Sequence, residues 1–295
     1  MIRVCVVGSV NNDLTFVVDR LPPPGATVLA SSLVSAPGGK GANQAIAAAR
    51  AGGQVQFVGA VGDDSVAAAL LAHLRANGVG TDAVSTVPGP SGTAVVMVDA
   101  AAENAIVVAP EANSHLALDS DAARRLVTES DVVLMQLEIP LPTVLEAARL
   151  ARRSGATVML NASPIPGAVA PLADVAQLAD VVVVNEEEAE HWQWRVPHLV
   201  ITRGARGASY IGLERVGVEH SFDVPAPVVD AVDTTGTGDV FAGVLASSWG
   251  AGRDRAVRRA CTAAALATLV RGAGNCAPTA KAIASAEADL RRERH

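Results

Sequence analysis

Short runs of valine, isoleucine and leucine alternate along the chain with longer, alanine-rich stretches that have helical spacing. The apolar runs predict strands at residues 3–7, 55–61, 131–137, 156–160, 180–184 and 198–202. The longer stretches predict helices at 41–51, 65–77, 141–154 and 172–178, and a mainly helical region at 238–290. Because the apolar runs are continuous rather than alternating, they are typical of strands buried on both faces of a parallel sheet. The pattern therefore predicts an α/β fold with a central, mostly parallel sheet flanked by helices.

Two segments, 14–33 and 93–108, interrupt this rhythm with extended, partly alternating patterns and turn residues. They lie where loops leave the carboxyl ends of strands in a doubly wound sheet, which is the usual ligand side. We interpret them as a small antiparallel β lid formed by residues 14–36 and 92–109, with an ordinary surface hairpin as the alternative. No internal repeat or linker is evident, so we expect one α/β domain over residues 1–295.

The charge and the residue counts exclude several classes of protein. The chain has 23 Lys and Arg against 30 Asp and Glu, a net charge of −7, whereas a protein that coats nucleic acid or an anionic membrane needs a basic surplus. No apolar run reaches the roughly 18 residues of a membrane span, and the first eight residues are too short for a signal peptide. The three cysteines form no C-x-x-C pair, which suits a reducing compartment. We expect a cytoplasmic protein without a His/Cys metal centre, whose partners are small molecules rather than nucleic acid or membrane.

The strongest chemical signal is the segment DTTGTGD at residues 233–239, directly before a predicted helix. Its glycines allow several backbone N–H groups to converge at the helix start, where they form an anion site. A carboxylate in the first helical turn, here Asp239, can accept a proton from an attacking hydroxyl. Phosphoryl transfer needs these two elements together. A glycine-rich turn capped by an acid is the structural alternative.

A second glycine-rich segment, PGGKGANQ at residues 37–44, opens an alanine-rich helix. It is not a P-loop, because Val34 and Gly41 stand where that motif needs Gly and Ser or Thr. The first strand is also followed by no G-x-G-x-x-G, which disfavours a dinucleotide-binding protein. Lys40 and Asn43 can instead bind a polyhydroxylated ligand. A helix start with a solvated lysine is the alternative.

Further polar residues follow the ends of predicted strands. Asn11 and Asp13 come after the first strand, Glu138 after the strand at 131–137, and residues 185–188 (NEEE) and 202–207 (TRGARG) after two later ones. An Asx turn and simple complements to helix dipoles are the alternatives for the acidic positions. Because the carboxyl ends of parallel strands share one edge of a sheet, these segments are expected to form one site.

Taken together, the motifs resemble those of the ribokinase (pfkB) family of sugar kinases, over nearly the whole chain from Val4 to about Thr279. The resemblance rests on residues 8–13, 38–44, 62–64, 135–138, 185–188, 201–207 and 233–239. It implies a ribokinase-like fold with a small β lid, and ATP-dependent phosphorylation of the ribose O5 hydroxyl to give ribose 5-phosphate. A family kinase for deoxyribose, fructose or a nucleoside, and a non-catalytic sugar or nucleotide sensor, are the alternatives.

The resemblance also implies roles for individual residues. Asp239 is the expected catalytic base, and Gly236, Thr237 and Gly238 form the expected anion hole. The positions expected to hold the sugar are Asn11, Asn12, Asp13, Gly39, Lys40, Gly41, Ala42, Asn43, Glu138 and Asp239. The positions expected to hold the nucleotide are Asn185, Thr202, Arg203, Gly204, Ala205, Arg206, Gly207, Gly238 and Asp239.

The resemblance further implies two cations and a homodimer that forms through the lid. Mg²⁺ is expected near Asn185 and Glu188. An activating K⁺ is expected at Asp233, Thr235, Ala267, Val270, Gly272 and Cys276. Three positions depart from the family pattern: Thr237 replaces Ala, Cys276 replaces Ser, and Cys261 replaces the His or Asn beside the adenine. A thiol is a poor ligand for K⁺, a hard cation that prefers oxygen.

Overall fold

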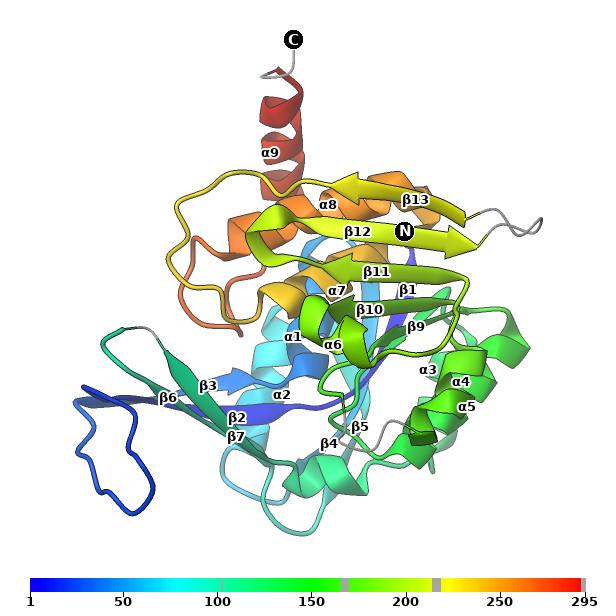
Figure 1. Ribbon diagram of the computed structural model, residues 1–295. Coiled ribbons are helices and arrows are strands. Elements are labelled where there is room, and N and C mark those ends of the chain that lie inside the picture. The colour runs from blue at the N-terminus through cyan, green and yellow to red at the C-terminus, as the bar shows by residue number, and fades with distance from the viewer. Residues whose placement is uncertain (102, 166–169, 214–218, 293–295) are drawn as a thin grey trace.

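The computed structural model describes residues 1–101, 103–165, 170–213 and 219–292, and its core is a nine-stranded sheet (Figure 1). Residue 102, within the expected lid, lies outside the described residues. The spatial order of the strands is β13 (Glu219–Val224), β12 (Ala208–Leu213), β11 (His198–Thr202), β10 (Val181–Asn185), β9 (Thr157–Asn161), β8 (Val132–Met135), β1 (Arg3–Val7), β4 (Gln54–Gly62) and β5 (Val79–Val87). All pairs are parallel except β11–β12 and β12–β13 at one edge. The predicted mostly parallel sheet is therefore confirmed.

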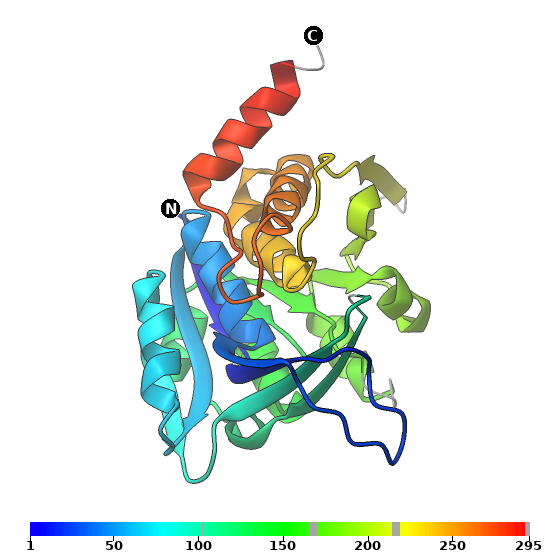
Figure 2. The same ribbon diagram turned by 90° about the vertical axis from the view of Figure 1, so that its left-hand side faces the viewer.

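Helices cover both faces of this sheet, because its strands are apolar on both sides. Along β1, Val4 and Val6 belong to one hydrophobic cluster, whereas Cys5 and Val7 belong to the other. The first cluster includes α1 (Lys40–Arg50), α2 (Ala67–Ala76), α7 (Thr237–Ser248) and α8 (Arg253–Ala267). The second includes α3 (Asp121–Thr128), α4 (Leu141–Ser154) and α5 (Ala173–Leu178). Two further helices are α6 (Glu186–His191) and α9 (Ala280–Arg292), and α9 projects from the body (Figure 2).

A second, four-stranded sheet projects from the carboxyl-end side of the large one (Figures 1 and 2). We call it the small sheet. In spatial order it consists of β3 (Ser32–Gly38), β2 (Asn11–Val17), β6 (Gly92–Val98) and β7 (Asn104–Ala109). The pairs β2–β3 and β6–β7 are antiparallel hairpins, as the sequence predicts.

The prediction of a purely antiparallel lid was wrong, because β2 and β6 pair in parallel. β2 follows β1 and β6 follows β5, which are strands on either side of β4 in the large sheet that run in the same direction. The small sheet also begins at Asn11 and ends its first hairpin at Gly38, so it is longer than residues 14–36. Asn11 and Asp13 are therefore strand residues of β2, and the alternative that they form an Asx turn is excluded.

Some elements carried no clear sequence signal. The strand β5 has polar residues on its exposed side, and β12 and β13 form the antiparallel edge of the sheet. Edge strands lack the continuous apolar runs that identify buried parallel strands. Among the described residues, no helix is long and apolar enough to cross a membrane.

Candidate active site

The start of α1 lies against the turn that joins the two sheets. Gly39 caps this helix with a φ of 93°, and a Cβ there would lie 2.8 Å from the backbone N of Asn11. Only glycine permits both the positive φ and the close approach. As a result, Lys40 and Asn43, in the first turn of α1, lie beside the first residues of β2.

The start of α7 brings Asp239 to the same place. Gly236 caps the helix with a φ of 77°, and a Cβ on Gly238 would meet nothing within 4 Å, so this helix start faces open space. Asp239 itself is only 7% exposed. Its Oδ2 accepts a hydrogen bond from Asn43 Nδ2 at 3.1 Å, and its Oδ1 accepts one from Gln44 Nε2 at 2.9 Å. The arrangement places the backbone N–H groups of a helix start beside a positioned carboxylate, as phosphoryl transfer requires. The N–H of Thr237 donates to the carbonyl of Thr234 at 3.3 Å.

Two buried polar atoms beside Asp239 lack any partner. They are Oδ1 of Asp13 and Oδ1 of Asn43, and both are acceptors. A third unpartnered acceptor among the described residues, Oε1 of Gln136, belongs to the adjoining hydrogen-bond network. Buried acceptors are normally hydrogen-bonded, so an unsatisfied pair in one place indicates a ligand that brings donors. Hydroxyl groups of a sugar are such donors.

The strand geometry separates the three polar residues that open β2. Side chains alternate along a strand, so Asn11 and Asp13 share one face and Asn12 lies on the other. Asn12 Oδ1 accepts a hydrogen bond from Ser35 Oγ at 2.8 Å, within the small sheet. Asn11 Oδ1 accepts one from Asn113 Nδ2 at 2.8 Å. The structure thus brings Asp13, but not Asn12, toward Asn43 and Asp239.

Several charges lie within electrostatic range of one another. Burial, together with the negative charges of Glu138 and Asp239, raises the pKa of Asp13 to about 7. Burial likewise raises the pKa of Glu138, although a hydrogen bond from Ser9 Oγ at 2.6 Å opposes the shift. Burial lowers the pKa of Lys40, but Asp239, Glu138 and Glu188 outweigh that effect and leave the pKa raised. Lys40 therefore carries a positive charge and interacts electrostatically with carboxylates from three different segments, those of Asp239, Glu138 and Glu188.

A cavity of about 610 Å³ opens next to the start of α7. Phe241 and Cys261 contribute to an apolar wall, together with small residues of α8. Six of the positions expected to hold the nucleotide also line this cavity: Asn185, Thr202, Gly204, Ala205, Gly207 and Gly238. The burial of Cys261 raises the pKa of its thiol to about 12, so this position is neutral and carries no charge toward a ligand.

Arg203 and Arg206 do not belong to the cavity lining. Arg206 pairs with Glu186, and Arg203 lies 3.8 Å from the same carboxylate and 3.6 Å from that of Asp223. Glu186 lines the cavity, so the two arginines are linked to the cavity only through their ion pairs with Glu186.

Two of the positions expected to hold the sugar are packed inside the protein. Ala42 is buried in the core. The backbone N of Gly41 donates a hydrogen bond to Ser9 Oγ.

The six positions expected to hold K⁺ lie on two segments that are bonded to each other: the turn before α7, and the end of α8 at Ala267 with the loop that follows it. Asp233 Oδ2 accepts a hydrogen bond from the backbone N of Gly272 at 2.9 Å, and the Cys276 sulfur lies 3.9 Å from the carbonyl of Thr235. Carbonyl and carboxylate oxygens suit a hard cation. Burial, with help from the nearby charge of Asp239, raises the pKa of Cys276 to about 11. The oxygen donors of these segments fit K⁺, and the neutral Cys276 thiol does not.

Asn185 and Glu188 form a reciprocal capping box at the start of α6. Asn185 Oδ1 accepts from the backbone N of Glu188 at 2.7 Å, and Glu188 Oε2 accepts from the backbone N of Asn185 at 2.8 Å. No group of three or more His, Cys, Asp or Glu side chains that could hold a metal occurs within the described ranges. Mg²⁺ bound to phosphates needs only one or two carboxylates, so this pair fits Mg²⁺ held mainly by phosphate oxygens and water.

Five polar residues of the site were not identified as such from the sequence. Three of them, Gln44, Gln136 and Asn161, stand inside or directly after predicted elements, so their place at a strand end or helix start is the available signal. The complete set is Ser9, Gln44, Asn113, Gln136 and Asn161. Asn113 is 1% exposed and comes from a single 3-10 turn, for which the sequence offers no signal.

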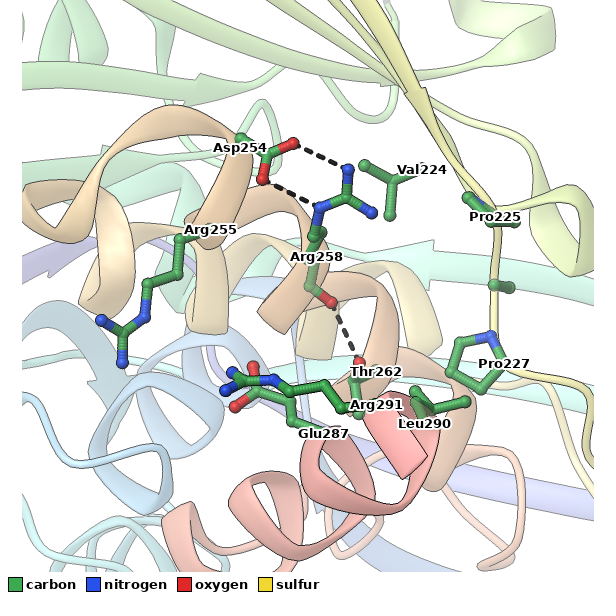
Figure 3. Close-up of a pocket in the computed structure, with 11 residues that line it drawn as sticks. Val224, Pro225, Pro227, Asp254, Arg255, Arg258, Thr262, Glu287, Leu290 and Arg291 are labelled. Carbon is green, nitrogen blue, oxygen red and sulfur yellow. Dashed lines mark hydrogen bonds and ion pairs between the residues drawn. The ribbon is translucent and has the colours of Figure 1, made fainter. Parts of the chain in front are cut away.

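A smaller cavity of about 290 Å³ lies between α8, α9 and the segment 224–227 (Figure 3). It shares Ala226 and Pro227 with the larger cavity, so this segment separates the two. Its Arg258 pairs with Asp254, as the dashed lines in Figure 3 show, and its Glu287 pairs with Arg259. None of the residues that carry the site described above lines this cavity.

The chain is similar to known proteins over nearly its full length. A model of the pfkB family carbohydrate kinases matches residues 1–280. The ribokinase of Bacillus subtilis is 37% identical over 297 residues, which cover 95% of this chain and 97% of that protein. A deoxyribokinase of Salmonella typhi is 31% identical over 299 residues, 94% of this chain and 95% of that one. The structure of Arabidopsis thaliana ribokinase complexed with ribose and ATP has a TM-score of 0.85 at 28% identity, covering 97% of this chain and 98% of that chain.

Proposed function

The chain belongs to the pfkB family of carbohydrate kinases, and from that premise we propose that it phosphorylates ribose at O5 with ATP, giving ribose 5-phosphate and ADP. The family resemblance expected from the motifs is thereby confirmed. The observation that carries the proposal is the convergence of Asp239, the unpartnered oxygens of Asp13 and Asn43, and the open start of α7 in one place. A sensor without catalytic activity would not need this carboxylate.

We propose that the sugar binds between β2 and the start of α1. Its hydroxyls donate to Asp13 Oδ1 and Asn43 Oδ1, two acceptors that lack partners. Lys40 and Glu138 complete the ring of polar groups around it. The O5 hydroxyl then faces Asp239, which accepts its proton as the O5–phosphorus bond forms and the bond from phosphorus to the leaving ADP oxygen breaks.

The backbone N–H groups of Gly236, Thr237 and Gly238 receive the negative charge that develops on the transferred phosphoryl group. Such donors are fixed before the reaction begins, so they need no reorganisation in the transition state. The cavity of about 610 Å³ accommodates the nucleotide, with the adenine against the apolar wall that includes Phe241 and Cys261. The Glu186 side chain, fixed by Arg203 and Arg206, borders this cavity.

Both expected cations are compatible with the residues present. A divalent cation bound to ATP would neutralise phosphate charge. Asn185 lines the cavity and Glu188 is bonded to Asn185, so this pair would hold the cation there. K⁺ would be held by the oxygens of the two bonded segments around Asp233, where it would order the start of α7. We expect Cys276→Ser to strengthen K⁺ activation, because it replaces sulfur with the oxygen that a hard cation prefers.

We further propose that the chain is one domain in which the small sheet closes over the sugar as a lid. This sheet exposes large apolar side chains: Val17, Leu33, Val34, Ile106, Val107 and Val108. Exposed apolar patches of this kind mark interaction sites, so a second copy of the sheet is the proposed cover, which gives a homodimer. Light scattering of the wild type and of Leu33→Asp tests this, since the variant is expected to be monomeric.

A substrate screen tests the proposed function. Release of ADP is measured with pentoses, hexoses and nucleosides as acceptors, in matched series that contain K⁺ or Na⁺. We expect ribose to give the highest kcat/KM and K⁺ to exceed Na⁺. A preference for fructose or a nucleoside would overturn the proposed substrate, and equal rates in both salts would remove the K⁺ site.

Deoxyribose is the second candidate substrate, because one relative with 31% identity is a deoxyribokinase. The two sugars differ only at the 2-hydroxyl group. A site that hydrogen-bonds this group rejects the analogue without it, because its buried acceptors are then left unpaired. The ratio of the two kcat/KM values in the same screen decides between them.

A further inference from the structure

A chain of buried amide side chains connects four separate segments to Asp239. Gln44 lies at its centre: its Nε2 donates to Asp239 Oδ1 and to Asn161 Oδ1, each at 2.9 Å. Its Oε1 accepts from Gln136 Nε2 at 2.6 Å. Asn161 Nδ2 in turn donates to the backbone carbonyl of Val183 on β10, at 3.2 Å. Gln44 and Gln136 are 0% exposed, so the chain is closed to solvent at its centre.

The backbone packing places Gln44 against the helix that carries Asp239. A Cβ on Gly243 would lie 2.2 Å from the backbone O of Gln44, so only glycine allows α7 to approach α1 this closely. Asp239 and Gly243 are four residues apart and share one face of α7. Gln44 therefore contacts this helix twice, through its backbone at Gly243 and through its side chain at Asp239.

Gln44 differs from Asn43 and Gln136 because it leaves no polar atom open to a ligand. Among the described residues, Gln136 Oε1 lacks a partner. Asn43 is the only amide of the group that both contacts Asp239 and carries an unpartnered acceptor. In contrast, both polar atoms of the Gln44 side chain are engaged within the protein. We propose that Gln44 is a positioning residue: it fixes the Asp239 carboxylate in the orientation from which it takes the sugar's proton, and Gln136 and Asn161 fix Gln44.

This inference rests on the proposed function and deepens it, because the positioned group is the proposed base. It implies that loss of Gln44 lowers kcat and leaves substrate binding unchanged. A displacement of a reacting group by about 1 Å can cost roughly 10²-fold in rate. Gln44→Met keeps the length and volume of the side chain but cannot donate to Asp239, so we expect kcat to fall about 10- to 100-fold.

The test measures kcat and both KM values for the wild type, Gln44→Met, Asp239→Asn and the double variant, with the acceptor that the wild type phosphorylates best. If Gln44 acts through Asp239, its loss costs little more once Asp239 is already replaced. We expect KM values within about threefold of the wild type. Additive losses of kcat, or a KM that rises as much as kcat falls, would show a merely structural role and overturn the inference.

Thr143→Val is the matched control. It also removes a buried hydrogen bond, from Thr143 Oγ1 to the carbonyl of Leu116 at 2.5 Å, but this bond on α4 involves neither Asp239 nor the amides that surround it. We expect its kcat to equal that of the wild type. If Gln44→Met does not fold, Gln136→Met replaces it, since that change removes the donor to Gln44 Oε1, together with the unpartnered Oε1 of Gln136, and predicts a smaller fall in kcat. A wild type that phosphorylates no sugar would refute the proposed function, whereas an active wild type with an unaffected Gln44→Met and Gln136→Met would refute this inference alone.

Discussion

The two halves of the site are built on different principles. The proposed sugar half is made of charged and amide side chains that already bond one another, with three buried acceptors left open among the described residues, on Asp13, Asn43 and Gln136. The nucleotide half is a cavity of about 610 Å³ bordered largely by glycines, alanines and apolar residues, with its arginines turned to Glu186. One half selects by placing individual polar atoms, and the other by the shape of a wall and the direction of backbone N–H groups.

This difference sets which changes the protein tolerates. A side chain that makes hydrogen bonds in the sugar half cannot be replaced without leaving its buried partner unsatisfied. A backbone donor in the nucleotide half remains in place whatever side chain follows it. Substitutions should therefore affect the sugar half strongly and the nucleotide half weakly, except where they change the backbone itself.

The largest expected effect is at the point where the halves meet. Asp239→Asn removes the proton acceptor but keeps the size of the side chain, so we expect kcat to fall by about 10²-fold or more. Ribose binding, measured by calorimetry in the absence of ATP, should remain close to that of the wild type. An Asn variant with wild-type turnover would show that this carboxylate is not the base.

The next effect tests the sugar half alone. Asp13→Ala removes one of the unpartnered acceptors. A hydrogen bond to a charged group contributes about 1.5–3 kcal/mol, so the KM for ribose should rise roughly 10- to 100-fold. The KM for ATP should change less than about threefold, because the nucleotide cavity is lined by other residues. An equal rise in both KM values would mean that the halves are not separable.

The raised pKa of Asp13 also predicts a pH-dependent cost to stability. Its pKa is about 7 in the folded protein, against roughly 3.9 when unfolded, so the folded state holds the proton more tightly. The stability that this group contributes is complete below about pH 4 and is lost as the pH rises toward 7. Asp13→Asn should therefore raise Tm at pH 8, by about 2 °C for each 1 kcal/mol relieved, and much less at pH 4.5. A Tm difference that is constant across this range would contradict the assigned pKa.

The smallest effect is expected in the nucleotide half. The Thr237 hydroxyl donates only to the carbonyl of Thr234, at 2.8 Å. The backbone N–H of Thr237 donates to the same carbonyl at 3.3 Å and is kept in Thr237→Ala, so we expect kcat and the KM for ATP to stay within about twofold of the wild type. Steady-state kinetics with varied ATP measures this. A loss of tenfold or more would assign the hydroxyl itself a role.

The sequence predicted the buried parts of the fold better than its edges. The strands with continuous apolar runs, such as β1 and β11, were located to within a residue or two, because burial on both faces leaves an unambiguous pattern. The parallel pairing of β2 with β6 was missed, since the pairing of strands far apart in the chain depends on where the preceding strands end. Local patterns do not contain that information.

The site shows the same limit at the level of single residues. Asp239, Lys40 and Asn43 were identified because their motifs put them at helix starts, where backbone geometry dictates their position. Asn12 was grouped with Asn11 and Asp13, although strand alternation turns it away, because that segment was interpreted as a loop. Asn113 was missed because its partner Val10 is 103 residues away along the chain. Contacts of this kind arise only when the chain has folded.

The chain of amides around Asp239 has a consequence for the end of the catalytic cycle. Amide groups, unlike imidazole or carboxyl groups, do not readily take up and release protons near neutral pH. Among the described residues, the hydrogen bonds to the two oxygens of Asp239 come from the amides of Asn43 and Gln44. A proton captured there cannot pass to either of these partners, so we expect it to leave on the side that faces the ligand, by the route that the product uses. Asp239 is therefore expected to lose its proton and become a base again only when the product leaves the site.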